Sequence, residues 1–233
     1  MSAAVIIAAH ADDDAHRVAA RRWVTDRYLA LFPWPVHVSI QRGAYWCKAE
    51  AVNPTAAEVD ADVLVIADAD SYTSLACMSA AVAAVQHGGA DWALPATSVY
   101  RLDQRSTEAV LATDPTTGKP ADGFTGRSHE LLPGGGIVVV RRDMWADVGG
   151  FDPRFHGWGG EDFALGCALR SLSGSYSHKV PGTLWHLWHP PAPSNGGLLP
   201  DANFALANRY RAAKFDPAAM RDIINERQAH GTD

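Results

Sequence analysis

The sequence has few cysteines, no long apolar segment and no excess of positive charge. Its three cysteines, Cys47, Cys77 and Cys167, are odd in number and far apart, so they predict neither a disulfide framework nor a zinc site. The apolar run at residues 3–9 is far shorter than the roughly 20 residues that cross a bilayer, and it lacks the basic start of a signal peptide. We therefore expect no transmembrane segment and a reducing, cytoplasmic location.

The overall composition favours a globular enzyme. A hydrophobic content of 47% argues against disorder, and 233 residues suffice for one well-buried domain. The net charge of −6 gives no general attraction to nucleic acid or to acidic membranes. These properties leave a single soluble domain as the simplest expectation, in which a local basic patch is still compatible with the net charge.

Apolar strands alternate with amphipathic helices along the chain, which predicts a single-domain α/β fold with a mostly parallel sheet flanked by helices. Three acidic residues at 12–14 follow the first strand, and we expect them to cap the next helix. The expected strands are residues 5–8, 36–40, 63–66, 91–95 and 137–140. The expected helices with both ends defined are residues 16–31, 79–87 and 142–148. We also expect a helix that begins near residue 48, another that begins at residue 161, and a C-terminal pair of helices around residues 216–217.

Two aspartates, Asp68 and Asp70, follow the buried strand at 63–66 and are separated only by a small alanine. One carboxylate of such a pair can bind a divalent cation while the other binds a ribose or a metal-bound water. Hard cations such as Mg²⁺ or Mn²⁺ take oxygen ligands and leave positions open for substrate phosphates. This pattern alone is common, but its place at the end of a buried strand favours a metal site.

A glycine-rich unit from residue 133 to residue 162 combines a strand, a short helix and a loop. Gly135 and Gly136 lie in a turn that we expect to face a ligand, because glycine lets backbone approach it closely. Trp158 stands between glycines and is suited to pack against the apolar face of a sugar. Glu161 and Asp162 open a helix; either they cap its N-terminus, or they bind sugar hydroxyls.

Residues 149–162, Gly-Gly-Phe-Asp-Pro-Arg-Phe-His-Gly-Trp-Gly-Gly-Glu-Asp, resemble a motif of glycosyltransferases with the GT-A fold, as found in family 2 enzymes, animal galactosyltransferases and polypeptide N-acetylgalactosaminyltransferases. The resemblance implies that Trp158 stacks on the acceptor sugar, that Glu161 holds the donor, and that Asp162 is the catalytic base. The polypeptide-modifying group has Glu-Asn at the last two positions. Asp162 departs from that pattern and favours inverting chemistry.

Three further segments resemble the same family in the same order. Lys48 begins a Lys-Ala-x-Ala-x-Asn sequence that implies a helix beside the donor nucleotide, with Trp46 near the nucleobase. The alternatives are that Trp46 packs in the protein core and that Lys48 is a solvated charge on the surface of the helix. The Asp-x-Asp pair resembles the family's metal motif, which assigns Asp70, together with Asp68, to the metal. The family's terminal histidine matches His186 best and His189 second.

The resemblance covers most of the chain, which divides into three expected parts. Residues 1–95 would bind nucleotide sugar and metal, residues 96–190 would hold the acceptor and catalytic groups, and residues 191–233 would form a C-terminal loop and helices. The Thr/Gly/Pro-rich segment 114–127 is a candidate lid over the donor. The Pro/Gly loop 190–200 could cover the acceptor cleft.

Together these features predict a metal-dependent glycosyltransferase that moves a sugar from a nucleotide sugar, UDP-linked, to an acceptor hydroxyl with Mn²⁺ or Mg²⁺ as cofactor. A protein, a glycan, a lipid-linked or small molecule, or a modified DNA base fits equally well as acceptor. Two alternatives stay open: a nucleotidyltransferase, which should carry a basic glycine-rich loop after its first strand, and a catalytically silent sugar-binding module. The acidic residues at 12–14 argue against the first. Opposing effects act on Asp162, because a helix N-terminus lowers the pKa of a carboxyl and burial raises it.

Overall fold

A computed structural model describes residues 1–117, 124–173, 178–191 and 199–229, and it has the predicted α/β architecture. The main sheet has six strands in the order β2-β1-β3-β8-β5-β9. Strands β1 and β2 run parallel, as do β1 and β3, whereas β8 is antiparallel to both of its neighbours. The strands are β1 (Ala3–His10), β2 (Val36–Gln41), β3 (Val63–Asp68), β5 (Trp92–Leu94), β8 (Ile137–Arg141) and β9 (His178–Lys179).

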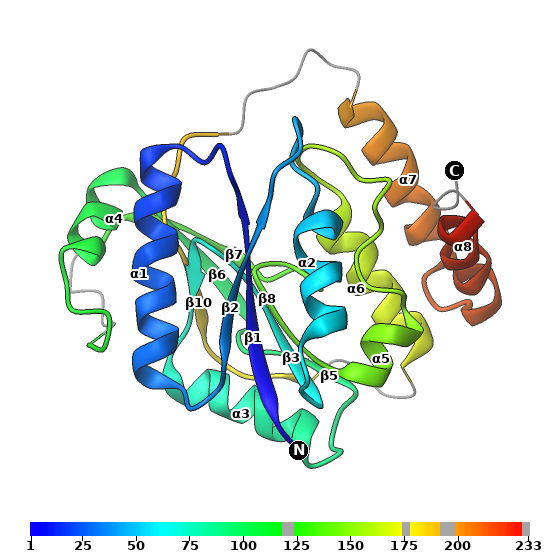
Figure 1. The fold of residues 1–233 in the computed structure, drawn as a ribbon, viewed down its shortest axis with the longest axis horizontal. Helices are drawn as coiled ribbons and strands as arrows, with labels where there is room; N and C mark the ends of the chain where they lie inside the picture. Colours follow the sequence, from blue (N-terminus) through cyan, green and yellow to red (C-terminus); the bar gives the residue numbers. More distant parts are fainter. Residues whose placement is uncertain (118–123, 174–177, 192–198, 230–233) are drawn as a thin grey trace.

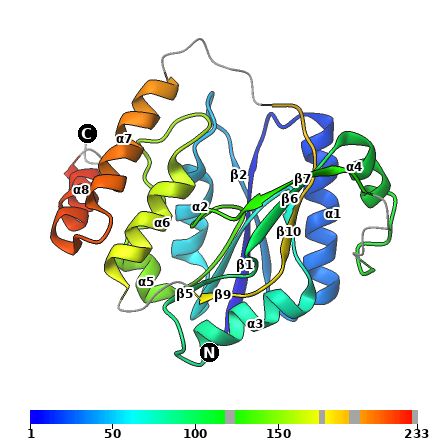
Figure 2. The ribbon, with the colours of Figure 1, turned by 180° about the vertical axis from the view of Figure 1, so that it is seen from behind.

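Helices cover both faces of this sheet (Figures 1 and 2). Two of them, α1 and α3, lie on one face, while α2, α5 and α6 lie on the other, and α7 and α8 pack outside α6. The helices are α1 (Ala15–Leu31), α2 (Lys48–Glu58), α3 (Leu75–Gln86), α4 (Gln104–Leu111), α5 (Arg142–Asp147), α6 (Glu161–Leu172), α7 (Leu199–Ala213) and α8 (Pro217–Ala229). No helix in these described ranges is long and apolar enough to span a membrane.

Local sequence signals account for the boundaries of several elements. The side chain of Asp14 accepts hydrogen bonds from the amides of His16 and Arg17, so it caps α1 as expected. Gly149 and Gly150 both have positive φ and end α5. Helix α3 begins at Leu75, earlier than the predicted 79, because Ser74 accepts a hydrogen bond from the Cys77 amide.

A second sheet was not predicted. It has four strands in the order β4-β10-β6-β7, which are β4 (Ser71–Tyr72), β10 (Thr183–His186), β6 (Ser98–Leu102) and β7 (Gly126–Glu130). Its members come from distant parts of the chain, so the pairing depends on the tertiary fold. Part of the candidate lid forms β7, while its residues 118–123 lie outside the described residues, as do residues 192–198 of the loop expected over the acceptor cleft.

The buried central strand β3 ends at the edge of the main sheet where a ligand site is expected. Every residue of β3 from Val63 to Ala67 is buried, which stabilises the strand through the hydrophobic effect. The strand ends at Asp68, beside the C-terminal end of β1. Because β8 is antiparallel to β3, its preceding glycine loop reaches the same edge. Ligand sites of open α/β sheets lie at such strand ends.

Candidate active site

Lys48 joins two carboxylates that are far apart in the sequence. Its Nζ lies 2.5 Å from Asp68 Oδ1 and 2.7 Å from Asp162 Oδ1. As the first residue of α2, Lys48 is 6% exposed, whereas both carboxylate side chains are partly open to solvent. Burial disfavours the charge on Lys48, but the carboxylates of Asp162 and Asp68 outweigh burial and raise the pKa of the ammonium.

Asp162 lies in the first turn of α6, directly after Glu161. Burial raises the pKa of Asp162 to about 7, although the adjacent Lys48 lowers it. Burial, together with the negative charges of Asp68 and Glu161, therefore outweighs the effect of Lys48 at this carboxyl. A carboxylate with a pKa near neutrality can accept a proton from a substrate at physiological pH.

The glycine loop before β8 packs between Asp68 and Asp162. The carbonyl of Gly136 accepts a hydrogen bond of 2.8 Å from the Asp68 amide. A Cβ atom on Gly134, whose φ is +88°, would stand 2.0 Å from the Asp162 carbonyl oxygen, so only glycine fits there. At Gly135 a Cβ atom would lie 4.0 Å from Asp162 Oδ2. The loop thus brings bare backbone, including Gly135 and Gly136, beside the two carboxylates.

Glu161 and Trp158 border the same helix N-terminus but differ in their surroundings. Glu161 Oε2 accepts a hydrogen bond of 3.1 Å from the Gly159 amide, and burial raises the pKa of this carboxyl. Trp158 is 79% exposed, which is unusual for so large an apolar side chain. The structure therefore excludes core packing for Trp158 and leaves its ring available to a partner.

A group of three potential metal ligands includes Asp70, which lies two residues after Asp68. Asp70 Oδ1 is 3.6 Å from His186 Nε2, and Asp70 Oδ2 is 3.2 Å from His189 Nε2. One ligand atom from each of the three residues can be chosen so that all lie within 4.8 Å of one another. These donors fit a divalent transition metal, because imidazole and carboxylate together suit such ions. Asp68, the other residue predicted to bind the metal, pairs with Lys48 in this structure.

Neighbouring groups hold the three ligands in place and set their charge. Asp70 accepts hydrogen bonds from the Ser71 hydroxyl at its carboxylate and from the Leu187 amide at its backbone carbonyl. Burial lowers the pKa of His186 more than Asp70 raises it, so this imidazole is neutral, as a metal ligand must be. The nearby Asp70 raises the pKa of His189 despite burial.

Comparisons with known proteins identify the family and the fold of the chain. A family model described as "Glycosyltransferase like family 2" matches residues 36–180, which is more than half of the chain. The chain belongs to this family. The match includes Lys48, Asp68, Asp70, Trp158 and Asp162 and ends before the two histidines. A search of curated proteins gives no significant match.

Solved structures of GT-A glycosyltransferases share the fold of this family 2 protein. The catalytic domain of Drosophila beta1,4galactosyltransferase 7, in complex with xylobiose, has a TM-score of 0.52 at 13% identity, with coverage of 88% of this chain and 80% of that chain. GalNAc-T7 with UDP, GalNAc and Mn²⁺ has a TM-score of 0.54 at 13% identity, with coverage of 97% and 55%. Glucosyl-3-phosphoglycerate synthase from Mycobacterium tuberculosis, with Mn²⁺, UDP-glucose and phosphoglyceric acid, has a TM-score of 0.51 at 15% identity, with coverage of 95% and 80%.

Trp46 lies two residues before the start of α2, close to the end of β1. Its ring makes an edge contact with His10, the last residue of β1, at a centroid distance of 6.2 Å. The Trp46 carbonyl accepts a hydrogen bond of 2.7 Å from Gly157, which ties this segment to the loop that carries Trp158. His10 Nε2 lies 2.9 Å from the Gly43 carbonyl oxygen. A single histidine at a strand end gives no specific sequence signal for a function.

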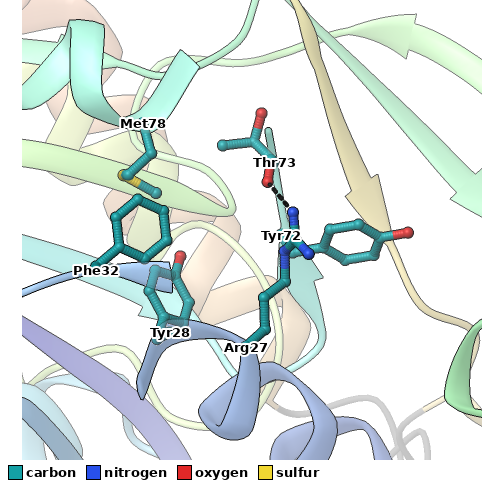
Figure 3. Close-up of a pocket in the computed structure, with 6 residues that line it drawn as sticks. All are labelled: Arg27, Tyr28, Phe32, Tyr72, Thr73 and Met78. Atoms are coloured by element: carbon teal, nitrogen blue, oxygen red, sulfur yellow. Dashed lines mark hydrogen bonds between the residues drawn. The ribbon is translucent and has the colours of Figure 1, made fainter. Parts of the chain in front are cut away.

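A buried arginine supports the strand that follows Asp70 in this glycosyltransferase. Figure 3 shows Arg27 beside Tyr72 and hydrogen-bonded to the backbone of Thr73. Arg27 is 5% exposed, and it also donates a 2.6 Å hydrogen bond to the Pro115 carbonyl. The surrounding pocket leaves no space for a water molecule, so it is a packing feature rather than a ligand site. Arg27 thus connects α1, β4 and the segment near residue 115.

Proposed function

We propose that this protein transfers a glycosyl group from a UDP-sugar to an acceptor hydroxyl in a Mn²⁺-dependent, inverting reaction. The observation that carries the proposal is the arrangement at Lys48, which places a carboxylate with a pKa of about 7, Asp162, beside Asp68 and the glycine loop. UDP and Mn²⁺ appear together in the structures of two GT-A proteins that share the fold, which supports this choice of donor and cofactor.

Asp70, His186 and His189 would hold the metal. Two imidazoles in the ligand set favour Mn²⁺ over Mg²⁺, because Mg²⁺ prefers oxygen ligands throughout. A bound Mn²⁺ would screen the diphosphate and stabilise the negative charge on the departing nucleotide. Asp68 lies one small residue away and would bind the donor ribose or sugar, with Gly135 and Gly136 alongside.

Asp162 would act as general base. In its charged form it accepts the proton of the acceptor hydroxyl while that oxygen attacks the anomeric carbon, so a C–O bond forms as the bond to the diphosphate breaks. Lys48 would hold the carboxylate in place through its 2.7 Å contact and favour the charged form. Glu161 would bind donor hydroxyls from the same helix turn. A single displacement on one face of the sugar inverts its configuration.

The acceptor would lie on the Trp158 side of Asp162. An exposed indole between glycines can stack on the apolar face of a sugar ring. Trp46, whose ring contacts His10, would contact the nucleobase. This arrangement supports an enzyme over a silent sugar-binding module, since such a module needs neither a carboxylate with a pKa near neutrality nor a group of metal ligands.

Thermal unfolding with a panel of nucleotide sugars tests this proposal. A UDP-sugar at one hundred times its Kd should add about 2.7 kcal/mol to the free energy of unfolding, and the gain should require Mn²⁺. The same mixture should slowly release UDP by hydrolysis, which distinguishes an enzyme from a sugar-binding module. The proposal fails if no UDP-sugar stabilises the protein in Mn²⁺, or if stabilisation occurs without any hydrolysis or transfer.

A further inference from the structure

The second sheet aligns basic residues with the metal group. His186 on β10 pairs in register with Arg101 on β6, and Arg101 pairs in register with Arg127 on β7. Residues paired in register point to the same face of a sheet. One row across the sheet is therefore formed by His186, Arg101 and Arg127. The strands at the two ends of this row, β10 and β7, are two strand spacings apart, or about 10 Å.

His129 joins this row on the same face. It is two residues after Arg127 on β7, and side chains two apart in a strand share a face. The side chains also meet directly, because Arg101 Nε donates a 3.3 Å hydrogen bond to His129 Nε2. Arg101, Arg127 and His129 are all exposed. We refer to these three residues as the basic cluster.

The face that carries the basic cluster is turned toward the reaction centre. Leu184 lies two residues before His186 on β10 and so shares its face, and a Cβ atom on Gly136 would stand 3.0 Å from Leu184. The glycine loop, which lies against Asp162, thus packs on this face of the second sheet. Strand β7 also leads within a few residues into that loop, through Leu131 and Leu132. The cluster therefore lies on the face of the second sheet that carries His186 and packs, through Leu184, against the glycine loop.

No carboxylate neutralises the cluster within the described part of the chain. Glu130, the nearest acidic residue on β7, lies on the other face and pairs with Lys179 at 3.3 Å. Asp103, just after β6, accepts hydrogen bonds from the Ser106 amide and the Thr125 hydroxyl. Two arginines side by side without an acidic partner repel each other, whereas guanidinium groups bind phosphate and carboxylate through paired hydrogen bonds.

We propose that the basic cluster, Arg101, Arg127 and His129, binds an anionic group of the acceptor, a phosphate or a carboxylate, while the acceptor hydroxyl lies at Asp162. This inference rests on the proposed glycosyltransferase function and names its acceptor class. The anion could belong to a phosphorylated or to a carboxylated acceptor, or to the donor sugar itself, and these sources can be distinguished.

The test compares glucose, glucuronate and glucose 6-phosphate as acceptors, with a UDP-sugar that the enzyme hydrolyses in Mn²⁺. An anionic acceptor should be used at a KM at least about tenfold below that of glucose, since charge-assisted hydrogen bonds contribute that much or more. Arg127→Ala should remove most of this preference, and Arg127→Lys should restore only part of it. Arg105→Ala, which removes an exposed arginine on α4, is the matched control and should keep the preference.

Calorimetry with the UDP–Mn²⁺ complex of the protein gives a readout that is independent of turnover. Glucose 6-phosphate or glucuronate should bind more tightly than glucose to the wild type, and this difference should shrink in Arg127→Ala. Equal use and equal binding of all three acceptors would overturn the inference while leaving the glycosyltransferase function intact. A loss of UDP-sugar affinity in Arg127→Ala as large as the loss for glucose 6-phosphate would also overturn it, by assigning the cluster to the donor. Failure of the wild type to hydrolyse any UDP-sugar would instead contradict the proposed function.

Discussion

Lys48 and Asp162, 114 residues apart in sequence, form an ion pair with a distance of 2.7 Å between Nζ and Oδ1. The pair connects the first turn of α2 to the first turn of α6, and the same Nζ contacts Asp68 at the end of β3. One buried ammonium thus orients two carboxylates at the site. It also opposes the effect of burial on the pKa of Asp162, so that the carboxyl titrates near neutral pH rather than well above it.

The rate of transfer should depend on pH through Asp162. With a pKa of about 7, the carboxyl is mostly protonated at pH 6, so kcat/KM should rise about tenfold from pH 6 to pH 7.5 and then level off. Lys48→Met removes the charge that lowers this pKa, so the rise should move to higher pH. The pH profiles of the wild type and of Lys48→Met measure this shift, with Lys214→Met as a control. An unshifted profile in Lys48→Met would contradict the effect of Lys48 on the pKa of Asp162.

Both histidines should contribute to metal binding. Replacement of a direct ligand should weaken Mn²⁺ binding in the presence of UDP by at least about tenfold, because even changes around metal ligands typically cost that much. His186→Ala and His189→Ala should each show this loss by calorimetry. His37→Ala, near the start of β2 and away from the site, should not. Unchanged Mn²⁺ affinity in His189→Ala would remove that residue from the ligand set.

Trp158 should matter for the acceptor and little for the donor. Trp158→Ala should raise the acceptor KM about tenfold, since stacking on a sugar ring contributes on the order of 1 kcal/mol or more, while the Kd for the UDP-sugar should change little. Steady-state kinetics and donor titration measure the two effects separately. Because the ring is exposed, the substitution should leave the free energy of unfolding unchanged. A matching loss of donor affinity would assign the ring to the nucleotide pocket.

Arg27 should stabilise the protein. Arg27→Met leaves the carbonyl groups of Thr73 and Pro115 without their charged donor, so the free energy of unfolding should fall by about 1–3 kcal/mol. Urea unfolding measures this change. Arg22→Met provides the control, because Arg22 is an exposed arginine on the same helix. Equal stability of the two variants would show that Arg27 contributes no net stabilisation.

Local sequence signals predicted much of the main sheet. The buried run of β3, the cap at Asp14 and the paired glycines after α5 act over a few residues, and each element formed where its signal placed it. The second sheet was missed because its strands are short and pair across long separations, such as His186 with Ser71.

The same distinction applies to the site. The residue types of Asp68, Asp70 and Asp162 indicated their chemistry, and the resemblance to GT-A enzymes indicated where they would lie. The contact that links two of them through Lys48, and the balance between burial and charge at Asp162, depend on three segments meeting in space. The approach of His189 to Asp70 at 3.2 Å likewise depends on how the chain leaves β10.

The identity of the base is tested most directly by the Asp162→Asn variant. Asparagine has the same size but cannot accept the proton, and a positioned general base contributes typically 10² to 10⁴ in rate. We predict a loss of that size in the transfer rate at pH 7.5, with UDP-sugar and Mn²⁺ binding retained and full activity in the exposed control Asp222→Asn. Proton NMR of the wild-type product should show inverted anomeric configuration. Transfer by Asp162→Asn at near wild-type rate, or a product with retained configuration, would contradict the role of Asp162 as the inverting base.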